Sequence, residues 1–357
     1  MKLFLIGGFL GSGKTTGISN ACLQLIKEGI KVAVITNDQG DQHVDSAHIN
    51  HINIPVKEVS NGCFCCNYSQ LDNHVQSLLT EFQPEIIFAE SVGSCTDMVA
   101  TIAKPLGLYR PGCELVISVF TDVSLLLAIM EGSASFVAEQ VQYIYKKQLE
   151  EADILVLNKT DLINGEQLDI VNSIIKNDFA GKIILQQNSM ETTAIRKWIE
   201  SARKFRRPSP LSSLDIDYDI YPSGEAQLAW LDSSLHISSP LPNAAAVAFQ
   251  IIKAIFLAIQ KEQWTIGHVK CIIEAENRQQ KISYTTMSQL PVDSIDLPDT
   301  HECRLLINAR VQTEPSGLKK LVENVLRETA NKYDCFIKQV RQSSFTPGYP
   351  KPTHRFA

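Results

Sequence analysis

The chain has 357 residues, 44% of them hydrophobic, which is enough to bury a sizeable core and predicts about two domains. A formal net charge of −6 argues against nucleic acid or an anionic membrane as the main partner, because both attract basic surfaces. The apolar run after Lys2 is short and lacks a small-residue cleavage site, and the most apolar later stretch, 244–259, is too short to span a bilayer, so we expect a cytoplasmic protein.

Residues 2–16, KLFLIGGFLGSGKTT, join a predicted strand to a phosphate-binding loop. The apolar residues 3–6 indicate a buried strand, and the pattern G-x-x-x-x-G-K-[ST] follows it directly. In that pattern backbone N–H groups surround a polyphosphate, Lys14 reaches the β- and γ-phosphates, and the Thr15 hydroxyl binds Mg²⁺. The nucleotide-binding residues predicted here are Gly8, Gly11, Ser12, Gly13, Lys14, Thr15 and Thr16.

The first 205 residues alternate buried-strand patterns with helical patterns. Strands are expected at 3–6, 31–36, 85–89, 114–119, 153–157 and 182–185, and helices at 16–28, 70–82, 136–150 and 165–179. Strands without polar alternation that are separated by helices predict a mostly parallel sheet covered on both faces. The fold class is therefore α/β, a P-loop NTPase domain whose ligands bind at the carboxyl ends of the strands.

A second domain is expected after a basic segment rich in proline and serine, RKFRRPSPLSS at 203–213, which is typical of a linker. Strands are expected at 227–237, 268–275, 280–286 and 303–309, and helices at 244–263 and 316–333. This order predicts a smaller α+β domain with its helices on one face of an antiparallel sheet. The predicted division is a P-loop domain at 1–205, a linker at 206–215, the α+β domain at 216–342 and an extended tail at 343–357.

The segment Asn158-Lys159-Thr160-Asp161 ends the predicted strand 153–157 and matches N-K-x-D, a base-reading pattern of P-loop proteins. The Asp161 carboxylate can accept two hydrogen bonds, from the N1–H and the exocyclic amine of guanine, whereas adenine offers no such pair of donors. The wrong base leaves this carboxylate unpaired, at a cost of ~1–3 kcal/mol. We therefore predict that Asn158, Lys159 and Asp161 select GTP over ATP.

Three of the nine cysteines, Cys63, Cys65 and Cys66, crowd into the loop SNGCFCC at 60–66. As thiolates they suit a soft or borderline metal such as Zn²⁺, with a fourth ligand from elsewhere or from solvent, and an open position would let the site pass its metal on. A redox pair and inert packing are the alternatives, but the loop is not the Cys-x-x-Cys at a helix start that lowers a thiol pKa. Cys95 could approach the same region, although a small loop residue is the favoured interpretation.

These motifs, in this order, resemble the CobW-type GTPases, a family related to the maturation GTPases HypB and UreG. The resemblance rests on GGFLGSGKTT, on GCFCC at 62–66, on ESVG at 90–93 after a buried strand, and on N-K-x-D at 158–161. It covers about the first 205 residues, and beyond them GHVKC at 267–271 is only loosely similar to the strand that opens the family's C-terminal domain. The family includes zinc chaperones and proteins linked to cobalamin and nitrile hydratase assembly.

The resemblance implies a role for each motif residue. Lys14 and Glu90 would form the catalytic pair, and Thr15 and Glu90 would hold Mg²⁺ or its water. The Cys-x-Cys-Cys loop would hold the cargo metal. The family's switch segment usually reads Asn-Glu-Phe-Gly, and here 37–40 reads NDQG, so Asp38 stands where a metal-site glutamate is expected, one methylene shorter. Asp41 and Asp45 are nearby alternatives.

The function implied by the resemblance is that of a GTP-hydrolysing metallochaperone or metal insertase. It would bind GTP or GDP with Mg²⁺ and deliver zinc or cobalt to a client metalloprotein, with cobalamin biosynthesis as one setting. Turnover is expected to be slow, because no arginine finger can be assigned and related switches depend on a partner or on a homodimer. An ATP-dependent small-molecule kinase and a metal-sensing GTP-binding regulatory module without significant turnover are the alternatives.

Overall fold

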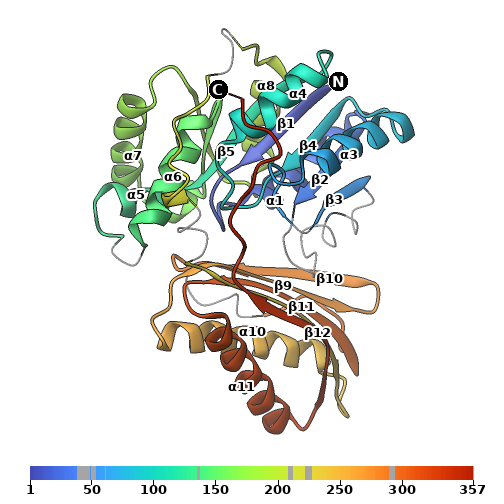
Figure 1. Cartoon of the computed structure of the whole chain (residues 1–357). Helices are drawn as coiled ribbons and strands as arrows, with labels where there is room; N and C mark the ends of the chain where they lie inside the picture. The colour runs from blue at the N-terminus through green and yellow to red at the C-terminus, as the bar shows by residue number, and fades with distance from the viewer. Residues whose placement is uncertain are drawn as a thin grey trace. The chain divides into compact units, whose positions relative to one another are not determined.

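A computed structural model of the chain shows two compact units (Figure 1). The structure describes residues 1–37, 49, 54–60, 62–134, 137–207, 212–221, 227–288 and 294–356. The first unit contains the described residues up to 221 together with 349–356, and the second contains those from 227 to 348. Within the described residues, the chain passes from the first unit to the second between 221 and 227 and returns to the first unit at 349.

The first unit is built on a sheet that has, within the described residues, seven strands in the order β3-β2-β4-β1-β5-β6-β7. Every neighbouring pair is parallel. The strands are β1 Lys2–Gly7, β2 Val32–Asn37, β3 Val56–Val59, β4 Ile86–Glu90, β5 Glu114–Asp122, β6 Ile154–Asn158 and β7 Ile183–Gln187. The predicted P-loop type of α/β fold is confirmed, and all the strand ends that carry motifs lie at the carboxyl edge of one sheet.

Helices cover both faces of this sheet. They are α1 Lys14–Lys27, α3 Tyr68–Glu81, α4 Lys104–Tyr109, α5 Val123–Met130, α6 Glu139–Glu151, α7 Gly165–Asp178 and α8 Thr192–Lys204, with a π-helical turn at Val99–Ala103 and a 3₁₀ turn at Thr160–Leu162. α1 and α8 share one core with the sheet, in which the indole N–H of Trp198 donates to Ser118 Oγ at 3.0 Å. α6 packs on the opposite face, where the hydroxyls of Tyr145 and Thr121 are in contact. Burial on both faces explains why the strands read as continuous apolar runs.

The second unit has an antiparallel sheet in the order β10-β9-β11-β8-β12, with α10 and α11 on one face, as predicted (Figure 1). Its elements are β8 Ala229–Ser238, α10 Ala244–Lys261, β9 Ile266–Ala275, β10 Arg278–Tyr284, β11 Glu302–Val311, α11 Pro315–Tyr333 and β12 Phe336–Phe345. By length and composition α10 is apolar enough to cross a membrane, with a mean hydropathy of 1.5, and 56% of it is buried within the protein. Its buried residues belong to the core of this unit.

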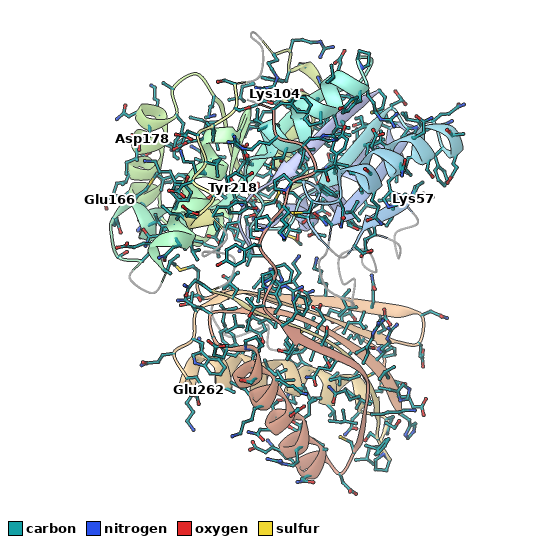
Figure 2. The ribbon with its side chains drawn as sticks, viewed as in Figure 1. Lys57, Lys104, Glu166, Asp178, Tyr218 and Glu262 are labelled. Atoms are coloured by element: carbon teal, nitrogen blue, oxygen red, sulfur yellow. The ribbon has the colours of Figure 1, made fainter. Side chains whose placement is uncertain are left out.

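Charged side chains project outward from both units. In Figure 2, Glu166 and Asp178 point away from α7, and Glu262 points away from the end of α10.

A buried ion pair lies inside the second unit, where Arg310 on β11 pairs with Asp232 on β8 at 2.8 Å and both side chains are at most 2% exposed. The guanidinium also lies 3.9 Å from the ring centroid of Trp230. Removal of one partner from such a buried pair strongly destabilises the fold, because the other charge is left buried and unpaired.

We expect Asp232→Ala to lower the free energy of unfolding of the second unit by about 3–5 kcal/mol, because the Arg310 charge then stays buried without its carboxylate. The measurement is urea unfolding followed by tryptophan fluorescence. Asp296→Ala is the matched control, since its carboxylate is 92% exposed and pairs with Arg278 on the surface. That control should lose less than about 1 kcal/mol. Equal losses of unfolding free energy in the two variants would show that the buried pair stabilises the fold no more than the surface pair does.

Candidate functional site

The phosphate loop approaches its neighbours so closely that glycine is required at two positions. Gly8 and Gly13 have φ of +125° and +90°. A Cβ on Gly8 would lie 2.1 Å from the Phe120 carbonyl oxygen, and one on Gly13 would lie 2.3 Å from Asn158 Nδ2. α1 begins at the next residue, so its N-terminal N–H groups and the positive end of its dipole face the loop. The other predicted loop residues, Gly11, Ser12 and Thr16, lie in the loop or in the first turn of α1.

The structure brings Thr15 and Glu90 together, and Lys14 precedes Thr15 at the start of α1; all three side chains are buried. The Lys14 ammonium donates to the carbonyl oxygen of Gly8 at 2.7 Å. The Thr15 hydroxyl donates to Glu90 Oε1 at 2.8 Å, which joins the start of α1 to the end of β4. A hydroxyl beside a carboxylate is the hard oxygen donor set that Mg²⁺ prefers, so these residues fit the ion.

Asn158, at the end of β6, connects the phosphate loop to the loop that follows β7 through its side-chain hydrogen bonds. Its amide nitrogen donates to the Ser12 carbonyl oxygen at 2.7 Å. Its amide oxygen accepts from the backbone N–H of Ser189 at 3.0 Å and from the Ser189 hydroxyl at 2.9 Å. The sequence argument did not include Ser189. Its position just after strand β7, at the same edge of the sheet, is the signal that could have identified it.

Lys159 and Asp161 lie beside Asn158 and point in different directions. Lys159 has φ of +63°, and its ammonium pairs with Asp122 Oδ2 at 2.8 Å. Asp122, at the end of β5, is a second residue that the sequence argument missed. Asp161 is exposed, which leaves its carboxylate accessible to a ligand. Asn158 therefore braces the phosphate loop, Lys159 pairs with the end of β5, and Asp161 faces solvent.

The cysteine loop is fixed to the end of β2 by the side chain of Asn37. The amide nitrogen of Asn37 donates to the Gly62 carbonyl oxygen at 2.7 Å, and its amide oxygen accepts from the Phe64 N–H at 2.9 Å. The loop then turns through hydrogen bonds from the Cys66 and Asn67 N–H groups to the Cys63 carbonyl oxygen, and α3 begins. A side chain at the carboxyl end of a parallel strand thus positions the thiols.

The sulfur atoms of Cys63, Cys65 and Cys66 lie close enough to share one ion. The separations are 2.8 Å between Cys63 and Cys65, 3.0 Å between Cys63 and Cys66, and 3.8 Å between Cys65 and Cys66. Tetrahedral Zn²⁺ with Zn–S bonds of about 2.3 Å would place its sulfurs about 3.8 Å apart. One separation already matches, and the Cys63 sulfur would have to move outward by about 1 Å. The three thiols therefore fit a soft metal ion.

The three thiols do not share their protons equally. Hydrogen bonds from the Cys63 and Cys65 thiols lower the pKa of Cys66 to about 3, and the backbone N–H of Lys351 adds to this effect. Hydrogen bonding within the cluster, together with burial, raises the pKa of Cys63. The cluster therefore favours a thiolate on its most exposed member, while its neighbours keep their protons. This lowered pKa corrects the expectation from the sequence, because Cys63 and Cys66 are themselves spaced Cys-x-x-Cys just ahead of α3.

Cys95 lies near the cluster. It comes five residues after Glu90 on the loop that follows β4, it is fully buried, and it raises the pKa of the Cys65 thiol, although the hydrogen bond of its own thiol goes to the Thr96 carbonyl oxygen. The sequence argument favoured a small loop residue at this position, because spacing alone could not show which loops meet. Asp38, with its alternatives Asp41 and Asp45, lies outside the described residues.

The C-terminal segment 349–356, dark red in Figure 1, crosses the cysteine loop within the first unit. The Thr353 N–H donates to the Cys65 carbonyl oxygen at 2.8 Å. The Lys351 N–H donates to the sulfur of Cys66 at 3.2 Å. The predicted tail therefore contributes a donor to the thiol cluster itself.

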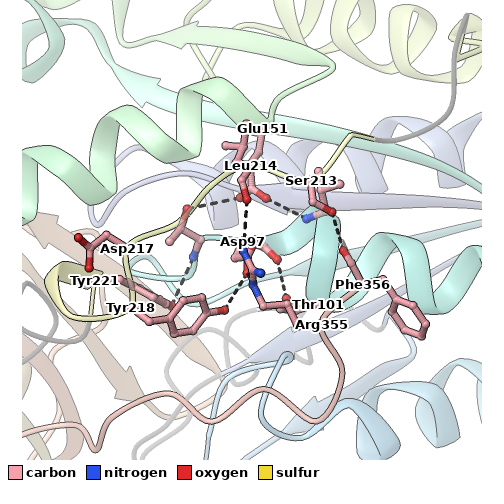
Figure 3. A network of polar contacts seen from close by, with 12 residues as sticks. Asp97, Thr101, Glu151, Ser213, Leu214, Asp217, Tyr218, Tyr221, Arg355 and Phe356 are labelled. Atoms are coloured by element: carbon pink, nitrogen blue, oxygen red, sulfur yellow. Dashed lines mark hydrogen bonds and ion pairs between the residues drawn. The ribbon is translucent and has the colours of Figure 1, made fainter.

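A polar network anchors the same segment a few residues farther on (Figure 3). At its centre is Asp97, a buried residue with φ of +61° on the loop that carries Cys95. Its carboxylate accepts from Arg355 at 2.8 Å and from the Tyr218 hydroxyl at 2.7 Å. The loop after β4, the segment around Tyr218 and the C-terminal segment are thus joined at one carboxylate.

Glu151, at the end of α6, forms hydrogen bonds with the segment that follows β4. One carboxylate oxygen accepts from the Val99 N–H at 2.9 Å, and the other accepts from the Thr96 hydroxyl at 3.4 Å. Burial, with a smaller contribution from the negative charge of Asp97, raises the pKa of Glu151 to about 7. The ammonium of Lys182 also interacts with this carboxylate. Glu151 is therefore a buried acid that ionises near neutral pH.

The strand, the phosphate loop and the helix in a parallel sheet define a fold of the P-loop NTPase class. The family model for the nucleotide-binding domain of CobW, HypB and UreG proteins matches residues 2–185. This chain belongs to the CobW/HypB/UreG family, as the motifs had indicated.

Curated relatives match over the same part of the chain. Zinc chaperone YeiR of Escherichia coli is 33% identical over 166 residues, which cover 45% of this chain and 47% of YeiR. Zinc-regulated GTPase metalloprotein activator 1 of Dictyostelium discoideum is 27% identical over 211 residues, 49% of this chain and 43% of that protein. The chain spans about half the length of the curated relatives it matches. The crystal structure of Zn(II)-bound YjiA from E. coli has 14% identity and a TM-score of 0.39, with 91% of this chain and 98% of that one covered.

The raised pKa of Glu151 predicts a pH-dependent stability. The folded state binds the Glu151 proton more tightly than the unfolded chain, so this group makes the first unit less stable as pH rises from about 4.5 to about 7. Glu151→Gln should remove that loss. The free energy of unfolding of the variant relative to the parent should increase by about 2–3 kcal/mol between pH 5 and pH 8. Denaturant titrations at both pH values measure it, and parallel pH profiles would contradict the assignment.

Proposed function

We propose that this protein is a GTP-dependent metallochaperone that carries a transition metal on Cys63, Cys65 and Cys66 and delivers it to a client metalloprotein. The observation that carries the proposal is the thiol cluster, whose three sulfurs lie within 4.8 Å of one another. The loop that holds them is bound to the end of β2, and the phosphate loop follows β1 in the same parallel sheet. A nucleotide site and a soft-metal site therefore share one sheet edge.

The proposed nucleotide is GTP. Asn158 and Lys159 hold the base-binding segment in place through Ser12 and Asp122, and the exposed carboxylate of Asp161 would accept the two guanine N–H donors. Gly8, Gly11, Ser12, Gly13 and Thr16 would donate backbone N–H groups to the phosphates.

Hydrolysis would depend on Lys14 and Glu90. Lys14 would neutralise the charge that develops on the transferred phosphoryl group, and Glu90 would orient Mg²⁺ or its water while Thr15 binds the ion. This function requires Lys14 to exchange its bond to the Gly8 carbonyl for the phosphates. We expect slow turnover until a client or a second copy of the chain completes the site, because phosphoryl transfer in this class gains most from a supplied arginine.

The proposed cargo is zinc first and cobalt, as in cobalamin assembly, second. Thiolates favour soft and borderline ions, and relatives of this chain are named zinc chaperones. The client is a cytoplasmic metalloprotein in this proposal. Without measurable turnover, the same site would serve as a metal-sensing GTP-binding module, and with a preference for ATP it would be a kinase.

Base selectivity tests the nucleotide assignment. GTP and GDP should bind at least ~100-fold tighter than ATP and ADP, a difference of about 2.7 kcal/mol, because only guanine pairs with Asp161. Asp161→Asn should shift the preference toward xanthine nucleotides, whereas the exposed carboxylate of Asp169 on α7 offers Asp169→Asn as a neutral control. Calorimetric titrations measure both. Equal affinity of the parent for GTP and ATP would refute the GTP assignment.

Lys14→Ala tests the catalytic assignment, because this variant should lose GTP hydrolysis. Hydrolysis at the parental rate in Lys14→Ala would refute the role of Lys14.

Metal content tests the cargo assignment. The purified parent should bind about one zinc ion per chain, and Cys65→Ser with Cys66→Ser should abolish binding, because one sulfur cannot hold the ion alone. Cys113→Ser, at a half-buried thiol outside the cluster, is the control.

Zinc affinity should also differ by 5- to 150-fold between the protein bound to a non-hydrolysable GTP analogue and the protein bound to GDP, measured by competition with a chelating dye. Zinc that stays bound to the double variant would exclude the thiol cluster as the site.

A further inference from the structure

The C-terminal segment 349–356 lies on the most accessible thiol of the cluster. Cys63 and Cys65 are at most 3% exposed, whereas Cys66 is only half-buried. The Lys351 N–H donates to the Cys66 sulfur at 3.2 Å. A donor from another protein would reach an ion on these thiols most directly from the Cys66 side, because the other two thiols are enclosed. The C-terminal segment therefore lies on the side from which a client would take the cargo.

The same segment is bonded to the backbone of the cysteine loop. The Thr353 N–H donates to the Cys65 carbonyl oxygen at 2.8 Å, and the Thr353 hydroxyl donates to the Cys66 carbonyl oxygen at 2.9 Å. Together with the bond from Lys351 to the Cys66 sulfur, these contacts involve two consecutive thiol residues. Hydrogen bonds of this kind orient the ligands of a metal ion from its outer shell, and their loss weakens metal binding.

A buried carboxylate anchors the far end of the segment (Figure 3). Arg355 pairs with Asp97 at 2.8 Å, and the Asp97 side chain is 0% exposed. The Phe356 N–H donates to the Ala100 carbonyl oxygen at 3.0 Å on the same side of the site. A carboxylate that is removed from water needs a cation beside it. Arg355 supplies that cation only while the segment lies in place, so the Asp97 charge favours the closed position.

We propose that the C-terminal segment retains the cargo ion, and that Arg355 is the positioning residue that holds this segment over Cys66. The inference rests on the proposed function and goes beyond it, because it gives cargo release a structural step. Arg355 must separate from Asp97 before the segment leaves the thiols. Transfer is then a ligand exchange, in which thiolates of this chain leave the ion as donors of the client bind it, with no change of oxidation state.

The first test needs no substitution in the segment. If the segment retains the ion, zinc must hold the segment in return, because the two equilibria are linked. Amide hydrogen exchange in 349–356 should therefore slow at least ~5-fold when the parent binds zinc. Zinc should have no such effect in Cys65→Ser with Cys66→Ser. Equal exchange with and without zinc, in a parent that binds the ion, would overturn the inference.

The second test measures how fast zinc passes to a chelating dye. Arg355→Ala should speed this transfer about 10-fold, because the outer-shell donors are then held less firmly. Asp97→Asn should act in the same direction, and asparagine tolerates the φ of +61° at this position, so the loop stays folded. Arg355→Lys, which keeps the positive charge, should recover part of the retention. Arg196→Ala is the control, since Arg196 pairs with Glu28 on the surface.

Cobalt in place of zinc gives a readout that a general loss of stability would not reproduce. The thiolate-to-cobalt charge-transfer band should move to longer wavelength in Arg355→Ala, because the Lys351 N–H no longer stabilises the electrons of the Cys66 sulfur. Arg196→Ala should keep the parental band. Parental transfer rates and a parental band in both Arg355→Ala and Asp97→Asn would overturn the inference and leave the proposed function standing. A parent that binds no zinc through the three thiols would refute both.

Discussion

The parallel pairing of β1 with β4 is the constraint on which the functional arrangement depends. Their register sets Ile6 opposite Glu90, and the Ile6 carbonyl oxygen accepts from both the backbone N–H and the hydroxyl of Ser91. Because the chain leaves both strands at the same level, the phosphate loop and the loop after Glu90 must run side by side. The hydrogen bond between Thr15 and Glu90 and the approach of Gly93 to the phosphate loop both follow from that register.

Much of the fold could be predicted because its signals are local. The apolar runs of β1 and of β4 to β7 need no partner to be recognised, and each residue of the phosphate loop has a role set by its immediate neighbours. The edge strands β3 and β12 were not predicted. β3 has four residues, and β12 has no buried residue and no clear alternation, so neither carries a hydrophobic pattern from which a strand could be identified.

The parts of the site that escaped prediction depend on contacts between distant segments. Ser189 acquires its role from Asn158, which lies 31 positions earlier, and Cys95 acquires its position near Cys65 only after α3 and β4 have been placed. Asn37 was recognised as part of a switch segment, yet its hydrogen bond to Phe64 follows from the sheet order β3-β2-β4. Sequence spacing identifies the chemistry of a side chain, whereas the loop that it meets is a property of the sheet.

The return of the chain to its first unit makes the second unit an insertion in covalent terms. A fragment that ended near residue 221 would keep every nucleotide and cysteine motif, and it would still lack Thr353 on the cysteine loop and Arg355 on Asp97. The ring of His354, which meets Tyr68 edge-on at 5.0 Å between centroids, would be missing from the same surface. Deletion series and C-terminal fusions on this protein therefore act on the cysteine loop directly, and a single protease cut near residue 347 would break the covalent link to the segment that covers this loop without cutting either core.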